Sequence, residues 1–347
     1  MRSPALGTIL MCALGWGVSA AAQQQAPAGP ANAKAQKTYQ SALQFARRGM
    51  NEEALGAFKK ADKQDGGECA LCQAAVVKYG VELQDWNAAT QAAQEEIAHA
   101  HGNRDLALAH YDMGYVLMQE GLLKHKQEIL TRSHEELAEA VAAAPNFPDA
   151  IFLDGRVLAE LHQDATAKAE FAQFVKMAPA DTPDRGRAER YLSDIELARE
   201  RMAPAFAATT LDGQRVSLDG LHGKVVLLDF WATWCAPCRA ALPRMQRIAR
   251  TFQGRPLVIL SVSLDSDAQK WKDFVAKNGM TWLNYRDGGF DGPIANLFGV
   301  KAIPHTFTID AHGVLRDEQI GDASIEGRLK KLVAQAEREN AQPPPPQ

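Results

Sequence analysis

The sequence lacks a surplus of positive charge and has no long apolar run outside its N-terminal segment. Its 347 residues include 38 Lys and Arg against 42 Asp and Glu, for a formal net charge of −4. A protein that binds nucleic acid through the phosphate backbone needs a basic surface. A helix that crosses a bilayer needs roughly 18 consecutive apolar residues. We therefore expect neither nucleic-acid binding nor a membrane span in the mature chain.

Cysteine is scarce as well, with five in the whole chain. Cys12 lies in the apolar N-terminal segment, and the other four form two C-x-x-C pairs, Cys69/Cys72 and Cys235/Cys238. Neither pair is followed by His, which argues against covalent haem attachment. Close pairs of this kind indicate local redox or metal units rather than a disulfide scaffold. No phosphate-binding loop, HExxH or nucleophile-elbow motif occurs in the sequence, and we expect neither a cofactor nor a metal.

The N-terminal segment has the organisation of a secretory signal peptide. Arg2 is followed by an apolar or small stretch from Leu6 to Val18, and small residues for a cleavage site come next. Met11 stands where a lipoprotein signal requires a small residue, so we expect Cys12 to leave with the signal. We assign residues 1–22 to a signal peptide and therefore predict a periplasmic or secreted protein. Disulfides persist in such compartments.

The composition of the remaining chain changes near Met202. Residues 37–201 are rich in Ala, Leu, Gln, Glu and Lys at helical spacing, whereas residues 203–340 alternate strand-like runs with helical ones. This predicts an all-α domain followed by an α/β domain. Residues 23–36 are expected to form a flexible leader and residues 341–347 a disordered Pro-rich tail.

The helical domain contains an internal repeat. Pro145 and Pro179 lie 34 residues apart, and Gly155, Ala167 and Phe171 fall between them at positions where two paired helices cross. A period of 34 residues with small residues at the crossing resembles the tetratricopeptide repeat. Other copies are weaker, and one requires an insertion, so an unrelated helical bundle is the alternative. Stacked repeats present a concave surface that usually binds a protein partner.

The last part of the helical domain is rich in charge. Residues 185–201 contain many Arg and Glu residues, with few apolar residues between them. Alternating charges of this kind are typical of a solvated helix with ion pairs along its face. We therefore expect a solvated helix that joins the two domains.

The segment Trp234-Cys235-Ala236-Pro237-Cys238 has the residues expected of a redox-active dithiol. A buried-strand run at 225–231 precedes it and a helical pattern follows at once, so Cys235 should lie at a helix N-terminus. Unpaired amides and the helix dipole stabilise an anion there and lower the pKa of a cysteine. Cys238 lies one turn further on, where it can resolve a mixed disulfide, and Pro237 suits the first helical turn. A purely structural disulfide is the alternative.

Residues 203–340 resemble the thioredoxin superfamily, in particular extracytoplasmic proteins of the TlpA/ResA type. The resemblance rests on a hairpin turn at residues 212–213, on the stretch 224–238, on an extra segment at 265–300 and on the loop at 300–304. It implies a thioredoxin-like α/β domain with a central mixed sheet flanked by helices. It also implies thiol–disulfide exchange with protein clients.

The same resemblance assigns residues around the dithiol. It implies that the Ile303–Pro304 peptide bond is cis and faces the two cysteines. A cis-proline turns the chain sharply, and the residue before it offers its backbone to an extended segment. Trp234, Pro237, Ile303 and Pro304 are therefore expected to form the substrate groove.

Some positions near the dithiol depart from the TlpA/ResA pattern. The glutamate that many of these relatives carry three residues after the second cysteine is Ala241 here, and Asp229 replaces an asparagine. We infer that the proton-handling carboxylate has moved to the strand, where a buried Asp229 would have a raised pKa and take the proton of Cys238. A merely tolerated or solvated Asp229 is the alternative. His305 either tunes the thiolate or lies on the surface beside the groove, and Trp282 is expected in the core.

Cys69 and Cys72 form a second pair, just after a turn at residues 65–67 and at the start of a repeat helix. Three interpretations remain open: a structural or packed pair, a redox relay with Cys235/Cys238, and half of a metal site. The pair lacks the flanking Trp and Pro of the other motif. Its case for redox activity is therefore weaker.

Together these features predict an exported thiol–disulfide oxidoreductase with Cys235, Cys238 and Asp229 as its catalytic residues. Its partners would be protein clients and a second redox protein, with another partner on the helical repeats. A thiol peroxidase is one alternative, although the peroxide-binding threonine and lone cysteine of peroxiredoxins are absent. A repeat-based adaptor with an incidental redox domain is the other. Reductants and oxidants share this fold, so the direction of exchange stays open.

Overall fold

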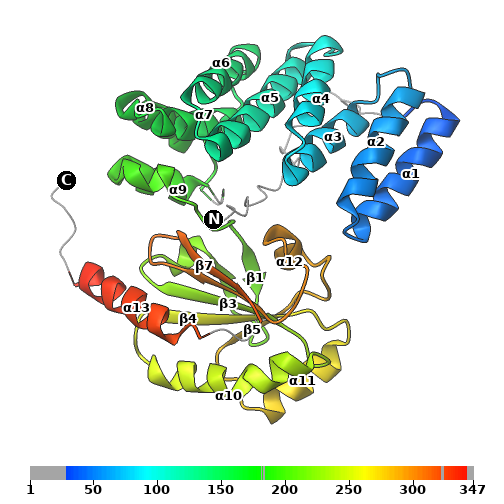
Figure 1. Cartoon of the computed structure of the whole chain (residues 1–347). Coiled ribbons are helices and arrows are strands. Elements are labelled where there is room, and N and C mark those ends of the chain that lie inside the picture. The colour runs from blue at the N-terminus through cyan, green and yellow to red at the C-terminus, as the bar shows by residue number, and fades with distance from the viewer. Residues whose placement is uncertain (1–28, 181, 183, 322–323, 342–347) are drawn as a thin grey trace. The chain divides into compact units, whose positions relative to one another are not determined.

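The computed structural model describes residues 29–341 apart from 181, 183 and 322–323 (Figure 1). The described chain divides into two compact units, one ending at Arg199 and the other beginning at Glu200. The predicted signal peptide at residues 1–22 and the tail from Gln342 lie outside the described residues. No helix in the described ranges is long and apolar enough to cross a membrane.

The first unit consists of helices that pack on one another in chain order. Their bounds are α1 Ala33–Arg47, α2 Asn51–Gln64, α3 Ala70–Leu83, α4 Trp86–Ala98, α5 Asn103–Lys124, α6 Gln127–Ala143, α7 Pro148–Glu160, α8 Asp164–Met177 and α9 Arg185–Ser193, followed by the 3₁₀ helix η1 Ile195–Arg199. Buried Ala, Leu, Val and Phe side chains fill the spaces between neighbouring helices. A helical region of this kind is consistent with the predicted repeats.

Small residues occur where paired helices cross. A Cβ atom added to Gly155 on α7 would lie 2.8 Å from the ring of Phe171 on α8. A Cβ atom added to Gly80 on α3 would lie 3.0 Å from the side chain of Ala89 on α4. Both distances are too short for a carbon–carbon contact, so glycine at these positions lets the helices approach closely. Close crossings of this kind occur in two of the helix pairs, α3/α4 and α7/α8.

Two segments of the first unit differ from expectation. Helix α1 begins at Ala33, inside the predicted flexible leader, because the side chain of Asn32 accepts the backbone N–H groups of Lys34 and Ala35. The expected solvated helix over residues 185–201 is also wrong.

The 185–201 segment breaks into α9 and η1, and its apolar residues are buried. Tyr191 is 1% exposed and lies between the rings of Phe152 and Phe171. Ile195 and Leu197 on η1 are buried as well. Charge dominates the composition of this segment, but a few well-spaced apolar side chains are enough to anchor it in the core.

The second unit is built around a five-stranded sheet with the order β5-β4-β3-β6-β7. The elements are β1 Ala207–Thr209, β2 Arg215–Ser217, η2 Asp219–Leu221, β3 Val225–Trp231, α10 Ala236–Thr251, β4 Leu257–Ser263, α11 Ala268–Lys277, β5 Leu283–Arg286, α12 Pro293–Leu297, β6 His305–Ile309, β7 Leu315–Ile320 and α13 Glu326–Asn340. Strands β3, β4 and β5 are parallel, and β6 and β7 join antiparallel. The predicted central mixed sheet flanked by helices is confirmed.

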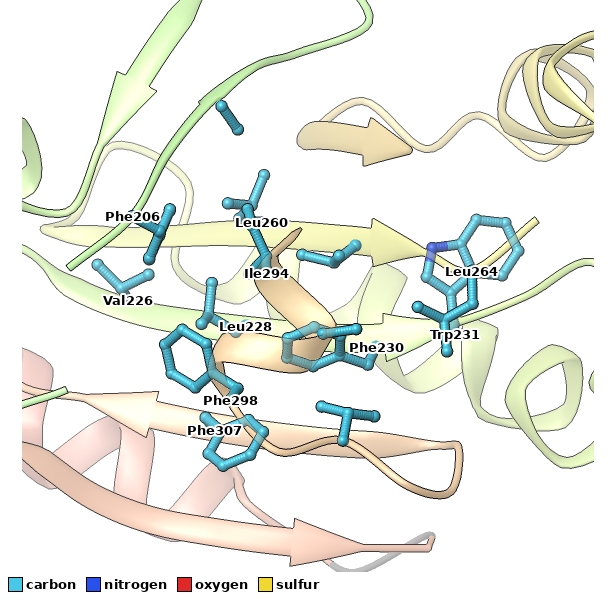
Figure 2. Packing of buried hydrophobic residues seen from close by; sticks show 14 of the residues in the cluster. Phe206, Val226, Leu228, Phe230, Trp231, Leu260, Leu264, Ile294, Phe298 and Phe307 are labelled. Carbon is cyan, nitrogen blue, oxygen red and sulfur yellow. The ribbon is translucent and has the colours of Figure 1, made fainter. Parts of the chain in front are cut away.

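Strand β3 lies at the centre of this sheet, and all seven of its residues are buried. Phe230 on one face packs with Phe298 and Phe307 (Figure 2). Val225 and Leu227 on the other face pack in a cluster that includes side chains of α10 and α13. Alternate residues of a strand share a face, so the register of β3 places Asp229 on the side of α10.

Candidate active site

Cys235 and Cys238 lie where the central strand passes into the first helix of the second unit. Cys235 caps α10, and its Sγ accepts the backbone N–H of Cys238 at 3.2 Å. The two sulfurs form a disulfide. Cys235 is 5% exposed and Cys238 7%, whereas the neighbouring Trp234 is 54% exposed. Pro237 lies in the first turn of α10, where its missing N–H has no helical acceptor to lose.

The loop before β6 contains the predicted proline. The Ile303–Pro304 peptide bond is cis. The carbonyl oxygen of Pro304 accepts the backbone N–H of Gly321 at 2.9 Å, which fixes the loop to the end of β7. Pro304 and Cys238 line the same cavity, so the structure brings the cis-proline loop and the dithiol together.

Asp229 is a buried acid two residues before the end of β3. It is 8% exposed, and the hydroxyl of Ser261 on β4 donates to its Oδ2 at 3.0 Å. Burial raises the pKa of Asp229 to about 6, although the bond from Ser261 and the charge of Arg244 oppose that shift. A carboxyl group with this pKa exchanges protons readily near neutral pH.

A small cavity, partly open to solvent, connects these groups. Asp229 and Cys238 both line it, together with Pro304 and the apolar side chains of Trp231, Leu242, Met245, Phe274 and Met280. Because Asp229 is buried, the alternative of a solvated residue is wrong, whereas that of a merely tolerated residue stays open. Arg239 and Arg244 line the cavity as well, and Asp229 and Cys238 are its only carboxyl- and thiol-bearing residues among the described lining. A small cavity shared by a carboxyl group and a cysteine is suited to moving a proton to or from that cysteine.

Comparison with known proteins identifies the second unit. Residues 200–318 match the model of the AhpC/TSA family. The chain is 33% identical over 134 residues to the thiol–disulfide oxidoreductase ResA of Bacillus thuringiensis, covering 38% of this chain and 76% of the relative. ResA of Bacillus anthracis matches at the same identity and coverage. The chain belongs to the ResA family of thiol–disulfide oxidoreductases.

Another curated relative and a solved structure are similar to parts of this ResA-family chain. The thioredoxin-like protein YneN of Bacillus subtilis is 30% identical over 139 residues, covering 40% of this chain and 81% of that protein. The crystal structure of a putative thiol:disulfide interchange protein DsbE from Chlorobium tepidum is 30% identical and has a TM-score of 0.35. It covers 40% of this chain and 96% of that one.

The loop that carries the ResA-family dithiol is held by an aspartate that sequence reasoning missed. Asp265, just after β4, accepts the backbone N–H and the hydroxyl of Thr233 at 2.9 and 2.6 Å. The hydroxyl of Ser263 also donates to it at 2.7 Å. Arg239 donates to the carbonyl oxygen of Thr233 at 2.7 Å. These bonds fix the backbone just before Trp234, and the only available signal was the position of Asp265 at the carboxyl end of a strand.

His305 is not a surface residue. It is 2% exposed, its Nε2 lies 3.1 Å from a carboxylate oxygen of Glu318, and its ring stacks on Phe307. His305 pairs with Phe230 across the two strands, so it lies on the face of the sheet opposite Asp229. Its ring is thus held by Glu318 and Phe307.

The second cysteine pair repeats the local geometry of the first but not its surroundings. Cys69 caps α3, and its Sγ accepts the N–H of Cys72 at 3.2 Å. The two form a disulfide and are 1% and 0% exposed. Asp62 accepts the backbone N–H of Cys69 at 3.1 Å. Across the described ranges no group of three or more His, Cys, Asp or Glu side chains is placed to hold a metal ion.

Proposed function

We propose that this chain is an exported oxidoreductase that exchanges disulfides with protein thiols through Cys235 and Cys238. One observation carries the proposal: the two cysteines lie at the N-terminus of α10, and Cys238 borders a cavity that Asp229 also lines. A thiolate at this position is stabilised by the free amides and the dipole of the helix. The family relation to ResA supports exchange between thiols and disulfides as the activity of this site.

The chemistry follows in two balanced steps. In the reducing direction the Cys235 thiolate attacks a client disulfide, so that a mixed disulfide forms and one client thiolate leaves. The Cys238 thiol then loses its proton and attacks Cys235 Sγ, which releases the second client thiolate and forms the Cys235–Cys238 disulfide. The electron pair passes from the dithiol to the client. An oxidant runs the same steps in reverse.

Asp229 acts as the proton acceptor for Cys238 in this scheme. Asp229 and Cys238 line the same cavity. The pKa of about 6 leaves the Asp229 carboxyl group ionised in most molecules at pH 7. A carboxylate in an apolar cavity is a stronger base than one in water, because burial disfavours its charge. Ala241 lines the same cavity, so α10 contributes no carboxylate at that position.

Trp234, Pro237, Ile303 and Pro304 form the client groove in this proposal. Trp234 is the most exposed of the large apolar side chains next to the cysteines, and Pro304 borders the cavity beside Cys238. An extended client segment would lie along the backbone of Ile303 and bring its sulfur to Cys235.

Export and partner binding belong to the proposal as well. The apolar stretch from Leu6 to Val18 and the small residues after it support cleavage of a signal peptide near Ala22. Stacked helix pairs in the first unit would supply a surface for a protein partner. N-terminal sequencing of the protein purified from whole cells of its native host tests the cleavage, and an intact Met1 contradicts it.

Trapping of the mixed disulfide tests the proposed exchange. Cys238→Ser leaves Cys235 able to attack but removes the resolving thiol, so clients should accumulate as adducts on Cys235. The matched variant Cys235→Ser should trap none, and Cys69→Ser/Cys72→Ser should behave like the unmodified chain. Equal adducts on both single variants would contradict the assigned roles.

Two further assays separate the alternatives. Consumption of hydrogen peroxide at the rate of disulfide exchange would favour a thiol peroxidase, and we expect it to be far slower. Normal binding of a partner without any exchange activity would favour an adaptor. The midpoint potential of Cys235/Cys238 against dithiothreitol and glutathione buffers gives the direction of electron flow.

A further inference from the structure

Two side chains behind Asp229 form a continuous hydrogen-bonded chain with it. Ser261 on β4 is the strand partner of Asp229 on β3, and its hydroxyl donates to Asp229 Oδ2 at 3.0 Å. Trp282, the residue before β5, donates its indole Nε1–H to Ser261 Oγ at 2.8 Å. Ser261 is completely buried, so water cannot replace either partner.

The chemistry of the three groups fixes the direction of this chain. An indole N–H can only donate, and a serine hydroxyl carries one hydrogen and accepts through its lone pairs. Because Trp282 occupies a lone pair of Ser261, the hydroxyl hydrogen points toward Asp229. A carboxylate with one oxygen held in this way cannot rotate freely about its Cβ–Cγ bond, so its other oxygen is held in place too.

Other groups act on Asp229 from the neighbouring elements. Arg244 on α10 lowers the pKa of Asp229 through its charge, and Cys238 and Arg239 on the same helix line the shared cavity. Thr306 on β6 is the partner of Asp229 on the other side of β3. Within the chain from Trp282 to Asp229, Ser261 is the group that donates directly to the carboxylate.

We propose that Ser261 and Trp282 are positioning residues that hold the Asp229 carboxylate for proton exchange with Cys238. This inference rests on the proposed role of Asp229 in disulfide exchange. Ser261 donates the hydrogen bond that stabilises the ionised carboxylate. Trp282 orients the Ser261 hydroxyl so that its hydrogen points toward Asp229. The chain runs from Trp282, just before β5, through Ser261 on β4 to Asp229 on β3.

Ser261→Ala tests the chain through the pH profile of exchange. Without the hydroxyl the pKa of Asp229 should rise, so the acid limb for resolution of a mixed disulfide should move to higher pH. Loss of a hydrogen bond to a charged group raises the pKa of that group enough to slow resolution roughly tenfold at pH values below the midpoint. Trp282→Phe keeps the Ser261 hydroxyl but removes the indole N–H that orients it. It should therefore move the acid limb to higher pH by a smaller amount. A profile that stays in place for Ser261→Ala would overturn the inference.

A measurement on the unmodified chain covers the case in which these variants fold poorly. The indole N–H resonance of Trp282 should titrate with the same midpoint as the side-chain carboxyl carbon of Asp229. Asp229→Asn should abolish that titration, and the indole of Trp86 in the first unit should be unaffected. A Trp282 resonance that does not move while Asp229 titrates would overturn the chain.

The two proposals fail in different ways. If Asp229→Asn slows resolution but the Ser261→Ala profile is unmoved, the positioning role is wrong and the role of Asp229 stands. If Asp229→Asn leaves resolution unchanged, the role of Asp229 and the positioning role that depends on it are both wrong.

Discussion

Asp229 carries its charge at a place where the charge is unfavourable. Burial raises its pKa from 3.8 to about 6. An acid whose pKa is higher in the folded state stabilises the fold fully only below its unfolded pKa, and that stabilisation is lost as the pH rises through the folded value. At pH 7 the ionised group therefore costs about 3 kcal/mol, since each pKa unit corresponds to about 1.4 kcal/mol.

Asp229→Asn should accordingly stabilise the second unit at pH 7 while slowing exchange. The gain should approach about 3 kcal/mol at pH 7 and vanish near pH 4, where the aspartate is protonated. Chemical denaturation at a series of pH values measures it. A variant less stable than the unmodified chain at pH 7 would show that the buried charge of Asp229 does not destabilise the fold.

The sequence predicted the local geometry of residues that lie in a motif: Cys235 caps α10 and the Ile303–Pro304 bond is cis. Cys235, Cys238 and Pro304 occur in short patterns with a fixed chemical meaning. Ser261 and Asp265 do not, because their roles depend on which residue of β4 lies beside β3 and on where that strand ends. Strand register is set by the whole sheet, so a local pattern cannot reveal it.

At the scale of single elements, α3 and α10 begin in the same way but in different surroundings. Cys69 has the carboxylate of Asp62 on its own backbone N–H, and its cluster is closed to solvent. A nearby carboxylate disfavours a thiolate, which makes a disulfide harder to reduce. Of the three interpretations left open, these surroundings favour a structural pair.

Cys69→Ser/Cys72→Ser should therefore weaken the helical unit without changing exchange. Loss of a disulfide that closes a short loop is expected to cost about 2 kcal/mol. Thermal unfolding of the first unit and the rate of insulin reduction are the two readouts. A change in the reduction rate, with the midpoint of unfolding unmoved, would support the redox relay instead.

Helix crossings in the first unit offer a second test at this scale. Gly155→Ala would place a Cβ atom 2.8 Å from Phe171, and overpacking of this kind costs about 1–3 kcal/mol. Gly56→Ala on α2 is the matched control, because a Cβ atom there has no other atom within 4 Å. The control should stabilise by up to about 1 kcal/mol through helix propensity. Equal effects of the two substitutions in thermal unfolding would show that the close crossing is not needed.

Elements marked by a motif or a continuous apolar run were easier to predict than the charged stretch 185–201. Strand β3 and helix α10 could be placed from the sequence, because a continuous apolar run and a cysteine pair mark them. The stretch 185–201 was misread because charge dominates its composition, while Tyr191 decides its packing. A single buried aromatic residue outweighs many exposed charges, since exposed ion pairs contribute little.

For the whole molecule, the change in composition near Met202 anticipated two units of different class. The contacts divide the described chain at residues 199 and 200, close to the predicted change. Composition separates helical repeats from an α/β fold because the two need different apolar spacings. The proposed partner of the helices cannot be predicted in this way, because partner binding depends on a surface and not on the core.

A fragment of residues 200–347 should reduce insulin as fast as the full chain. The match to ResA spans 76% of that protein, although it covers only 38% of this chain, so this unit resembles a complete oxidoreductase. Turnover measured at equal dithiol concentration provides the comparison. A folded fragment with much slower turnover would mean that the helical unit takes part in the chemistry.

The central claim is that Cys235 and Cys238 act together as one exchanging dithiol. Reaction of the reduced chain with a small chromogenic disulfide, in a Cys69→Ser/Cys72→Ser background, tests it most directly. We predict rapid release of both halves of the probe and formation of the Cys235–Cys238 disulfide, with Cys238→Ser stopping at a mixed disulfide on Cys235. A Cys235→Ser variant that reacts as fast as the intact dithiol would contradict the account.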